Sequence, residues 1–360
     1  MHSPLKSALA MFFVLVLAAC GSSTNPTAIP QPTQLPPTPA STNTLPSPTI
    51  PPPPTFTPTF IPPTPTLFPP TLAPSARLEF VATIDAPDKL SRPDGLATDA
   101  ENNLYVLDAR KNRVVKFDAS GKFLLKWGKA GIGKGEILSL GWGGLASHRD
   151  FVYVVDNANT RIDKFTNDGK FVTMWGQNAD GTREFVRPIY VTVNSQGNVY
   201  VTDDENPEIK IFDADGKFLG KWGEKGTGAG RLSHVTGIAI DSQDNVWLAD
   251  FENNLIQQFS ADGKYLTGFG KKGTALGELT GPNGLALDSF GHIYVTDRMN
   301  HRVQVFLPDG TLLAAIGSRG KANEQFDFPA GIAVNSQNNI YVSDERNNRV
   351  QQFRLVQSQP

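Results

Sequence analysis

The sequence predicts an all-β fold, a six-bladed β-propeller, from three observations. A short aliphatic segment with a Tyr or Trp near its start and an Asp at its end occurs six times. Successive copies lie 48, 47, 47, 47 and 47 residues apart. Each period holds several short strand patterns, and a period in the forties with this content is typical of propeller blades. The six segments end at Asp108, Asp156, Asp203, Asp250, Asp297 and Asp344.

Each period is expected to form four strands. The first has a small-residue pattern such as 95–97, which suits an innermost strand because Gly and Ala let backbones approach closely. The second is the segment that ends in Asp, and the fourth follows a Gly turn typical of a tight hairpin. The third ends in Phe in every period, at Phe117, Phe165, Phe212, Phe259, Phe306 and Phe353.

The sixth period stops after its third strand, at residues 353–355. A missing fourth strand would leave an exposed sheet edge. Residues 78–84, which precede the first period, resemble a fourth strand such as 122–127. We therefore expect 78–84 to complete the sixth blade and close the ring, and we expect truncation of either end to open it.

Residues 1–20 have the pattern of a secretory signal, with Lys6 before an apolar run at 9–19 that is too short to span a bilayer. The junction Leu-Ala-Ala-Cys at 17–20 resembles a bacterial lipoprotein signal. The resemblance implies cleavage before Cys20 and attachment of lipid to its sulfur. The protein would then be extracytoplasmic and anchored by lipid to the cell membrane or outer membrane. An ordinary signal peptide with an incidental cysteine is the alternative.

Residues 21–76 are expected to form a disordered spacer. They contain 19 of the 28 prolines and no charged residue. Proline fixes φ and lacks an amide donor, so this composition excludes a helix or a central strand and favours an extended, Pro/Thr-rich stalk. The propeller then occupies residues 77–360.

The charge balance of 77–360 excludes one class of partner. It holds 32 Lys and Arg against 35 Asp and Glu, a net charge of −3, which gives no electrostatic signature of a nucleic-acid partner. The single cysteine excludes a disulfide framework and a cysteine-based zinc site. We also expect no metal and no cofactor, because the four histidines after the signal fall in four different registers of the repeat: His148, His234, His292 and His301.

A family resemblance rests on the fifth period. The segments 282–288, 291–297 and 300–306, followed by Asp309-Gly310, resemble an NHL repeat. The resemblance extends over 92–355 in six copies and implies a six-bladed propeller. NHL domains include protein- and RNA-binding platforms and extracellular sensor domains of bacterial receptor kinases. Similar propellers include the peptidylglycine amidating lyase and gluconolactonase-like enzymes, so the fold alone does not decide the function.

The six repeated aspartates are expected to be structural. A residue present in every blade serves what every blade needs, and Asp before a turn can accept backbone amide hydrogen bonds. Arginines five residues later are the expected partners of that turn, at Arg113, Arg161, Arg302 and Arg349.

Residues that break the repeat are more informative. Trp142 and Tyr190 are out of register, and both fall near the start of an innermost strand, in the second and third blades. They would lie at the mouth of the central channel, where they either stack on a ligand or plug the channel. The third period departs further, since Ile189-Tyr190 replaces the usual Gly and Pro207-Glu208 replaces Asn/His-Arg.

A second set of candidates lies sixteen residues before each repeated Asp, at Arg92, Leu140, Arg187, His234, Gly281 and Phe328. The arginines suit a carboxylate or phosphate, and Asp94 and Asn283 would add polar groups around an aromatic floor. The alternative is that these are solvated loop residues. The acidic run 203–208 is expected to be a solvated turn rather than a Ca²⁺ site, because its spacing is not that of an EF-hand loop.

These features favour a non-enzymatic, membrane-anchored module that binds a protein, peptide or carbohydrate ligand at the channel mouth. The candidate binding residues are Trp142, Tyr190, Arg92, Arg187, His234, Asp94 and Asn283. No catalytic residue is assigned. The alternative is an extracytoplasmic lyase or lactone hydrolase that uses the polar residues of the same mouth.

Overall fold

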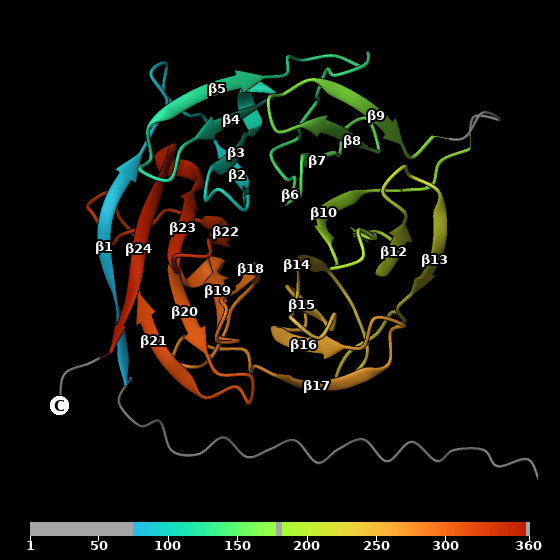
Figure 1. The fold of residues 1–360 in the computed structure, drawn as a ribbon. Coiled ribbons are helices and arrows are strands. Elements are labelled where there is room, and N and C mark those ends of the chain that lie inside the picture. The colour runs from blue at the N-terminus through green and yellow to red at the C-terminus, as the bar shows by residue number, and fades with distance from the viewer. Residues whose placement is uncertain (1–74, 178–181, 358–360) are drawn as a thin grey trace, which may run out of the picture. The chain divides into compact units, whose positions relative to one another are not determined.

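The computed structural model describes residues 75–177 and 182–357, which form a six-bladed β-propeller (Figure 1). Each blade is a four-stranded antiparallel sheet, so the predicted fold class is confirmed. In blades 1 to 5 the strands follow one another outward from the axis in chain order. The signal predicted at 1–20 and nearly all of the spacer predicted at 21–76 lie outside the described residues.

The strands occupy four concentric positions. The innermost are β2 (Pro93–Thr98), β6 (Leu145–His148), β10 (Pro188–Val193), β14 (Val235–Ile240), β18 (Pro282–Leu287) and β22 (Pro329–Val334). The second are β3 (Leu104–Asp108), β7 (Phe151–Asp156), β11 (Val199–Asp203), β15 (Val246–Asp250), β19 (Ile293–Asp297) and β23 (Asn339–Asp344). The third are β4 (Arg113–Phe117), β8 (Arg161–Thr166), β12 (Glu208–Phe212), β16 (Leu255–Phe259), β20 (Arg302–Phe306) and β24 (Arg349–Gln357). The outermost are β5 (Phe123–Trp127), β9 (Phe171–Trp175), β13 (Phe218–Trp222), β17 (Tyr265–Phe269), β21 (Leu312–Ile316) and, in blade 6, β1 (Ala76–Ile84).

Short 3₁₀ turns follow the second strand in three blades, at η1 (Ala109–Lys111), η2 (Arg298–Asn300) and η3 (Glu345–Asn347). Among the residues that the structure describes, no helix is long and apolar enough to cross a membrane.

The blades pack face to face around the axis. The second strand of each blade is buried, apart from its first residue in blades 2 and 6, because neighbouring blades cover both of its faces, which explains its continuous apolar pattern. Tyr105 in β3 packs edge to face on Trp127 of the outermost strand, with ring centroids 6.0 Å apart. Gly169 of the next blade has φ +82°, and a Cβ there would lie 2.8 Å from the Trp127 ring. The Gly turns therefore permit inter-blade packing as well as a hairpin.

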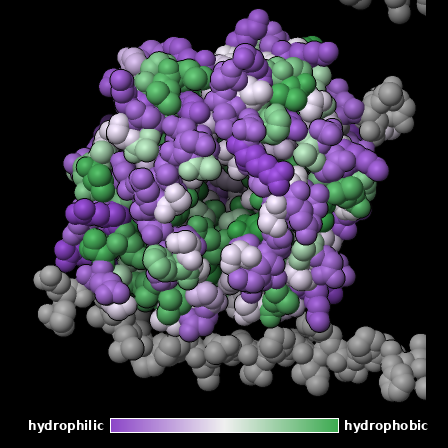
Figure 2. Space-filling model, viewed as in Figure 1, coloured by the Kyte–Doolittle hydropathy of each residue, from purple (hydrophilic) through white to green (hydrophobic). Residues whose placement is uncertain are grey.

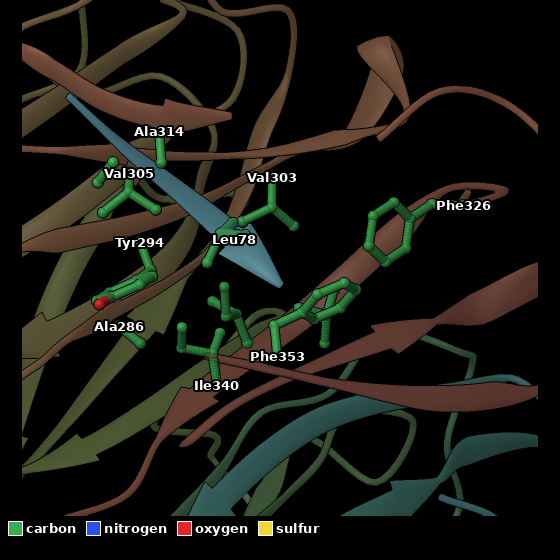
Figure 3. Packing of buried hydrophobic residues seen from close by; sticks show 12 residues of the cluster. Leu78, Ala286, Tyr294, Val303, Val305, Ala314, Phe326, Ile340 and Phe353 are labelled. Atoms are coloured by element: carbon green, nitrogen blue, oxygen red, sulfur yellow. The ribbon is translucent and has the colours of Figure 1, made fainter. Parts of the chain in front are cut away.

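The N-terminal strand closes the ring, as the sequence predicts. β1 pairs antiparallel with β24, and Leu78 lies opposite Leu355 in the sheet order β1-β24-β23-β22. Figure 3 shows Leu78 within the buried cluster that contains Val303 of blade 5 and Phe353 of blade 6. Blade 6 is thus built from both ends of the described chain, and β1 covers the edge that β24 would otherwise expose.

Each repeated Asp ties the loop that enters its blade to the turn after the second strand. In blade 5, Asp297 Oδ1 accepts the Thr280 N–H at 2.7 Å, and Oδ2 accepts Arg302 Nε–H at 2.7 Å. The other three arginines contact the Asp of their own blade, which confirms their predicted structural role. Arg113 and Arg349 donate Nε–H to Asp108 and Asp344, and Arg161 forms an ion pair with Asp156 at 2.9 Å. In blade 3, whose Arg is missing, Lys210 contacts Asp203 at 2.8 Å instead.

Candidate binding site at the channel mouth

The innermost strands begin at a channel mouth, where the loops that enter the blades meet the turns after the second strands. The ring is hollowed at its centre on the face shown in Figure 2, with apolar residues gathered along one side of the hollow. In five blades the innermost strand has a register shift directly after its start, whereas β6 of blade 2 has none. Blade 2 therefore shapes the mouth differently from the others.

The loop that enters blade 2 is longer than its counterparts, which corrects one sequence prediction. In three blades, the last residue of the loop before the innermost strand donates its backbone N–H to an Asn or His of the preceding blade. These residues are Arg92, Gly281 and Phe328. In blade 2 the residue so held is Ser139, whose N–H lies 2.8 Å from Asn112 Oδ1. Leu140 is therefore not the equivalent of Arg92, because the extra residues displace it outward, where it is 65% exposed.

The longer loop carries Trp142 across the mouth. Asn157 holds its backbone, because Oδ1 accepts the Leu140 N–H at 3.0 Å and Nδ2 donates to the Trp142 carbonyl. The half-buried indole ring lies 5.0 Å from the guanidinium carbon of Arg298 in blade 5, on the opposite side of the ring, and 6.4 Å from the His234 ring in blade 4. Trp142 thus contacts two distant blades.

Tyr190 fills the channel wall beside it. Its ring lies over Gly144 of blade 2, where an added Cβ would be 2.7 Å from Tyr190 Cα and 3.1 Å from Cδ1. The hydroxyl donates a long hydrogen bond of 3.4 Å to Asp94 Oδ1 in blade 1. Because Tyr190 is only 7% exposed and packed on backbone, it acts as a plug in this structure rather than as a free stacking surface.

Asp94 is the buried acid of the mouth. It is 3% exposed, and its Oδ2 accepts the Gly143 N–H at 2.7 Å. Burial, reinforced by the charge of Glu345, raises the pKa of Asp94 to about 7, while Arg298 and Arg92 oppose the rise. Burial also raises the pKa of Tyr190 well above its usual value. Near neutral pH the Asp94 carboxyl is therefore poised between its charged and neutral forms.

Two carboxylates organise the cations of the mouth. Glu345, 2% exposed, accepts Arg92 Nε–H at 2.9 Å and is also bound by Arg298 Nη2. Arg298 is itself buried between Trp142 and Phe328, whose ring centroid is 5.4 Å away. Blades 1, 2, 5 and 6 are joined through this cluster.

The second carboxylate is Asp204, whose burial corrects part of the expectation of a solvated acidic turn at 203–208, since Glu205 and Asn206 are the exposed residues of this run. Asp204 is 7% exposed, pairs with Arg187, and lies 2.9 Å from His234 Nε2. The His234 ring packs on Phe251 at 5.3 Å, and burial lowers the pKa of His234. Charged side chains are too costly to bury without such partners, which explains why Asp204 gathers two of them.

Asn283 occupies the position of Asp94 on β18 of blade 5. It is 1% exposed, and neither its Oδ1 nor its Nδ2 has a hydrogen-bond partner within the described part of the chain. A buried amide without partners is costly, so this side chain is suited to bind a water or a polar ligand group.

The sequence did not single out as site residues the side chains that pair with these candidates. Each directly follows a repeated Asp, and this position holds a different residue in every blade: Ala109, Asn157, Asp204, Phe251, Arg298 and Glu345. The variation at this position, next to an Asp that is the same in every blade, was the sequence signal that could have identified these residues. The structure brings six candidates together around the mouth in two clusters, namely Arg92, Asp94, Trp142 and Tyr190, and Arg187 with His234. The seventh candidate, Asn283, lies on β18, the innermost strand of blade 5. Across residues 75–177 and 182–357, no three His, Cys, Asp or Glu side chains are placed to share a metal ion.

Comparison with protein families agrees with this architecture. Residues 279–306 and 326–353 match the NHL repeat, and residues 189–269 match a family described as a 6-bladed beta-propeller. The protein is therefore a six-bladed β-propeller that carries NHL repeats. No curated protein matches its sequence.

Solved structures with this fold include both enzymes and a protein of unknown function. Virginiamycin B lyase from Staphylococcus aureus, solved in a catalytically inactive form with quinupristin, is 14% identical with a TM-score of 0.54, over 78% of this chain and 100% of that one. A gluconolactonase from Xanthomonas campestris is 15% identical with a TM-score of 0.56, over 77% and 99%. A Bacteroides thetaiotaomicron protein of unknown function is 14% identical with a TM-score of 0.60, over 78% and 76%. At these identities the likeness establishes the fold alone.

Proposed function

We propose that this protein is a lipid-anchored, extracytoplasmic propeller that binds a carbohydrate, peptide or protein segment at its channel mouth. The observation that carries the proposal is the asymmetry of the mouth. Each of the six blades has a structural Asp at the same position, and the residue directly after that Asp differs in every blade. A purely structural role would use the same residue six times, as the Asp does. A single asymmetric ligand requires different groups around it.

The chemistry of the mouth suits a ligand with an apolar ring and an anionic group. Trp142, Phe251 and Phe328 are half-buried and offer aromatic surface. Arg92 and Arg187 flank them from blades 1 and 3, with 39% and 49% of their side chains exposed. Both guanidinium groups already contact a carboxylate, so a ligand carboxylate or phosphate would share or replace that partner.

The binding role is tested by calorimetric titration of glycans and peptides into the mature, unlipidated chain. Arg187→Ala and Trp142→Phe are expected to weaken the affinity at least about tenfold, a loss of about 1.4 kcal/mol. Lys217→Ala removes a charge from an exposed hairpin at the other end of its blade and is the matched control. Equal affinity in all three variants would remove the mouth as the site.

The anchor is tested separately. Cys20→Ala is expected to move the protein from the membrane fraction to the soluble extracytoplasmic fraction and to abolish labelling by a radioactive fatty acid. Unchanged membrane association of Cys20→Ala would refute the lipid anchor without affecting the binding proposal.

Asp94 favours a second candidate function, an extracytoplasmic lyase or lactone hydrolase. A buried carboxyl with a pKa of about 7, beside the Tyr190 hydroxyl, matches the demands of acid–base catalysis. The test is turnover of quinupristin and gluconolactone by the wild type and by Asp94→Asn. An enzyme would lose turnover in this near-isosteric variant and retain ligand binding. Absence of turnover in the wild type would exclude these two substrates.

A further inference from the structure

A pocket of about 190 Å³ lies on blade 6, between the loop that enters the blade and turn η3. Its lining combines three cations and two amides without a carboxylate: Lys321, Arg346, Asn347, Asn348 and Arg349. None of these five residues belongs to the clusters at the channel mouth. The pocket adjoins the mouth, because Asn348 accepts the Arg92 N–H and Arg346 packs on Phe328, but its lining is a different, positively charged set of residues.

Two of its cations have no counter-charge. In the described ranges, neither Lys321 nor Arg346 has a carboxylate oxygen within 4.0 Å. The two carboxylates nearest to Arg346 in sequence are engaged elsewhere. Asp344 accepts Arg349 Nε–H at 2.8 Å, and Glu345 is bound by arginines of the mouth. The charges of Lys321 and Arg346 are thus not neutralised by a direct ion pair, whereas Arg349 is paired with Asp344.

The walls of the pocket are held in place. Arg349 Nη2 donates to the carbonyls of Ala322 at 2.7 Å and Gln325 at 2.9 Å. Asn347 Nδ2 donates to the Gly320 carbonyl at 2.7 Å. The guanidinium carbon of Arg346 lies 4.0 Å from the centroid of the Phe328 ring, which orients this otherwise exposed side chain. A site fixed in advance loses less entropy when a ligand binds.

Blade 5 has the same hydrogen bonds between its loop and its third strand without the two free cations. Arg302 Nη2 donates to the Ala275 and Glu278 carbonyls at 2.8 and 2.7 Å, as Arg349 does in blade 6. At the positions of Lys321 and Arg346, blade 5 has Thr274 and Met299. The shared arginine is therefore structural, and the two extra cations are an addition that blade 5 lacks.

We infer that this pocket binds an oxyanion, a phosphate or carboxylate group, through Lys321 and Arg346. The Arg346 fork can bind two oxygens at once, while Lys321 supplies a point charge, and charge-assisted hydrogen bonds of this kind are the strong ones. The pocket accepts a free anion or the anionic group of a larger ligand. The inference does not depend on binding at the channel mouth.

The test is calorimetric titration of the mature, unlipidated chain with inorganic phosphate, glycerol phosphate and acetate. One site per chain is expected. Lys321→Thr with Arg346→Met, which installs the blade 5 pair, should weaken phosphate binding at least about tenfold. The reciprocal change, Thr274→Lys with Met299→Arg, should create a second site. Tighter binding of glycerol phosphate than of phosphate identifies the group of a larger ligand, and equal binding identifies the free anion.

Three outcomes overturn the inference. The first is the absence of binding to the wild type, and the second is unchanged affinity in the blade 6 double variant when its thermal midpoint matches that of the wild type. The third is loss of phosphate binding in Arg187→Ala with no loss in the blade 6 variant, which would assign the anion to the mouth. Failure of glycans or peptides to bind at the mouth leaves the predicted phosphate titration unchanged, so the two proposals are distinguished.

Discussion

Blades 5 and 2 share one strand plan but hold their entering loops by different chemistry. In blade 5, Gln304 Oε1 accepts the Gly277 N–H at 2.8 Å, and Nε2 donates to the Glu278 carbonyl at 2.7 Å. Gln257 and Gln351 repeat this neutral clamp in blades 4 and 6. The same position in blade 2 is Asp163, which is fully buried and whose carboxyl oxygens accept no hydrogen bond from the described residues.

The carboxyl of Asp163 shares one cation with the structural Asp of its blade. Arg161 Nε lies 3.1 Å from Asp163 and 2.9 Å from Asp156. Blade 2 is also the blade with the longer loop that carries Trp142 and without the register shift in its innermost strand. The repeated residues therefore hold the ring together, whereas blade 2, which departs from the repeat, gives the mouth a different shape.

The largest expected effect comes from removing the structural Asp in each blade. Asp297→Ala leaves Arg302 buried without a charge partner and frees the Thr280 N–H, which should cost about 3–5 kcal/mol of unfolding free energy. Asp156→Ala should cost distinctly less, because Asp163 remains 3.1 Å from Arg161. Urea unfolding of both variants measures the difference. Equal losses would show that Asp163 does not compensate.

The second-largest loss of stability is expected from weakening β1, the strand that completes blade 6. Leu78 is 5% exposed in the cluster shared with Val303 and Phe353, so Leu78→Ala should cost about 2–5 kcal/mol. Val81, on the same strand, is 45% exposed, and Val81→Ala should change the free energy of unfolding by about 0.5 kcal/mol or less. Similar losses in the two variants would mean that β1 is not packed as a blade strand.

The third prediction concerns pH. Burial, with the Asp156 charge adding to it, raises the pKa of Asp163 to about 8. The unfolded chain releases this proton near pH 4 and the folded chain only near pH 8, so the unfolded state binds fewer protons in between. Stability should therefore fall as pH rises from about 4 to about 8, by up to about 1.4 kcal/mol per pH unit for one proton.

Asp163→Gln, which installs the residue of blades 4 to 6, should remove this slope and raise stability at pH 8. Urea unfolding at pH 5, 6, 7 and 8 measures it. Asp94→Asn is the comparison variant, because its buried carboxyl, with a pKa of about 7, gives a slope of the same sign that ends about one pH unit lower. A slope that Asp163→Gln leaves unchanged would contradict the assignment.

The ring was predictable from the sequence because its determinants are local and repeat six times. The Asp that ends each second strand, the Phe of the third and the Gly turn recur at fixed spacing, and residues 78–84 had the pattern of the one missing strand. The extra residues of blade 2 were not placed correctly. A spacing of 48 instead of 47 shows that a period is longer but not where it grows, so counting back from Asp156 selected Leu140 rather than Ser139.

The chemistry of the mouth was predictable only in part, because its pairs join distant blades. Arg92 and Glu345 are 253 residues apart in the chain, and only closure of the ring brings them into contact. Asp204 directly follows a structural Asp, so its sequence context indicated a solvated turn. Its burial depends on His234 and Arg187, which lie on other elements. Tyr190 plugs the channel instead of stacking on a ligand because Gly144 of blade 2 has no side chain and lets the Tyr190 ring pack on its backbone.

The smallest expected effect separates the two roles of Tyr190. Its hydroxyl bond to Asp94 is long, at 3.4 Å, so Tyr190→Phe should change the free energy of unfolding by less than about 1 kcal/mol. The ring still fills the channel in this variant, and the plug is preserved. The hydroxyl stabilises the charged form of Asp94 by donating to it, so its removal should raise the pKa of that carboxyl. An NMR titration of the Asp94 side chain in both proteins measures the shift, and a lower pKa in Tyr190→Phe would show that the hydroxyl does not donate to Asp94.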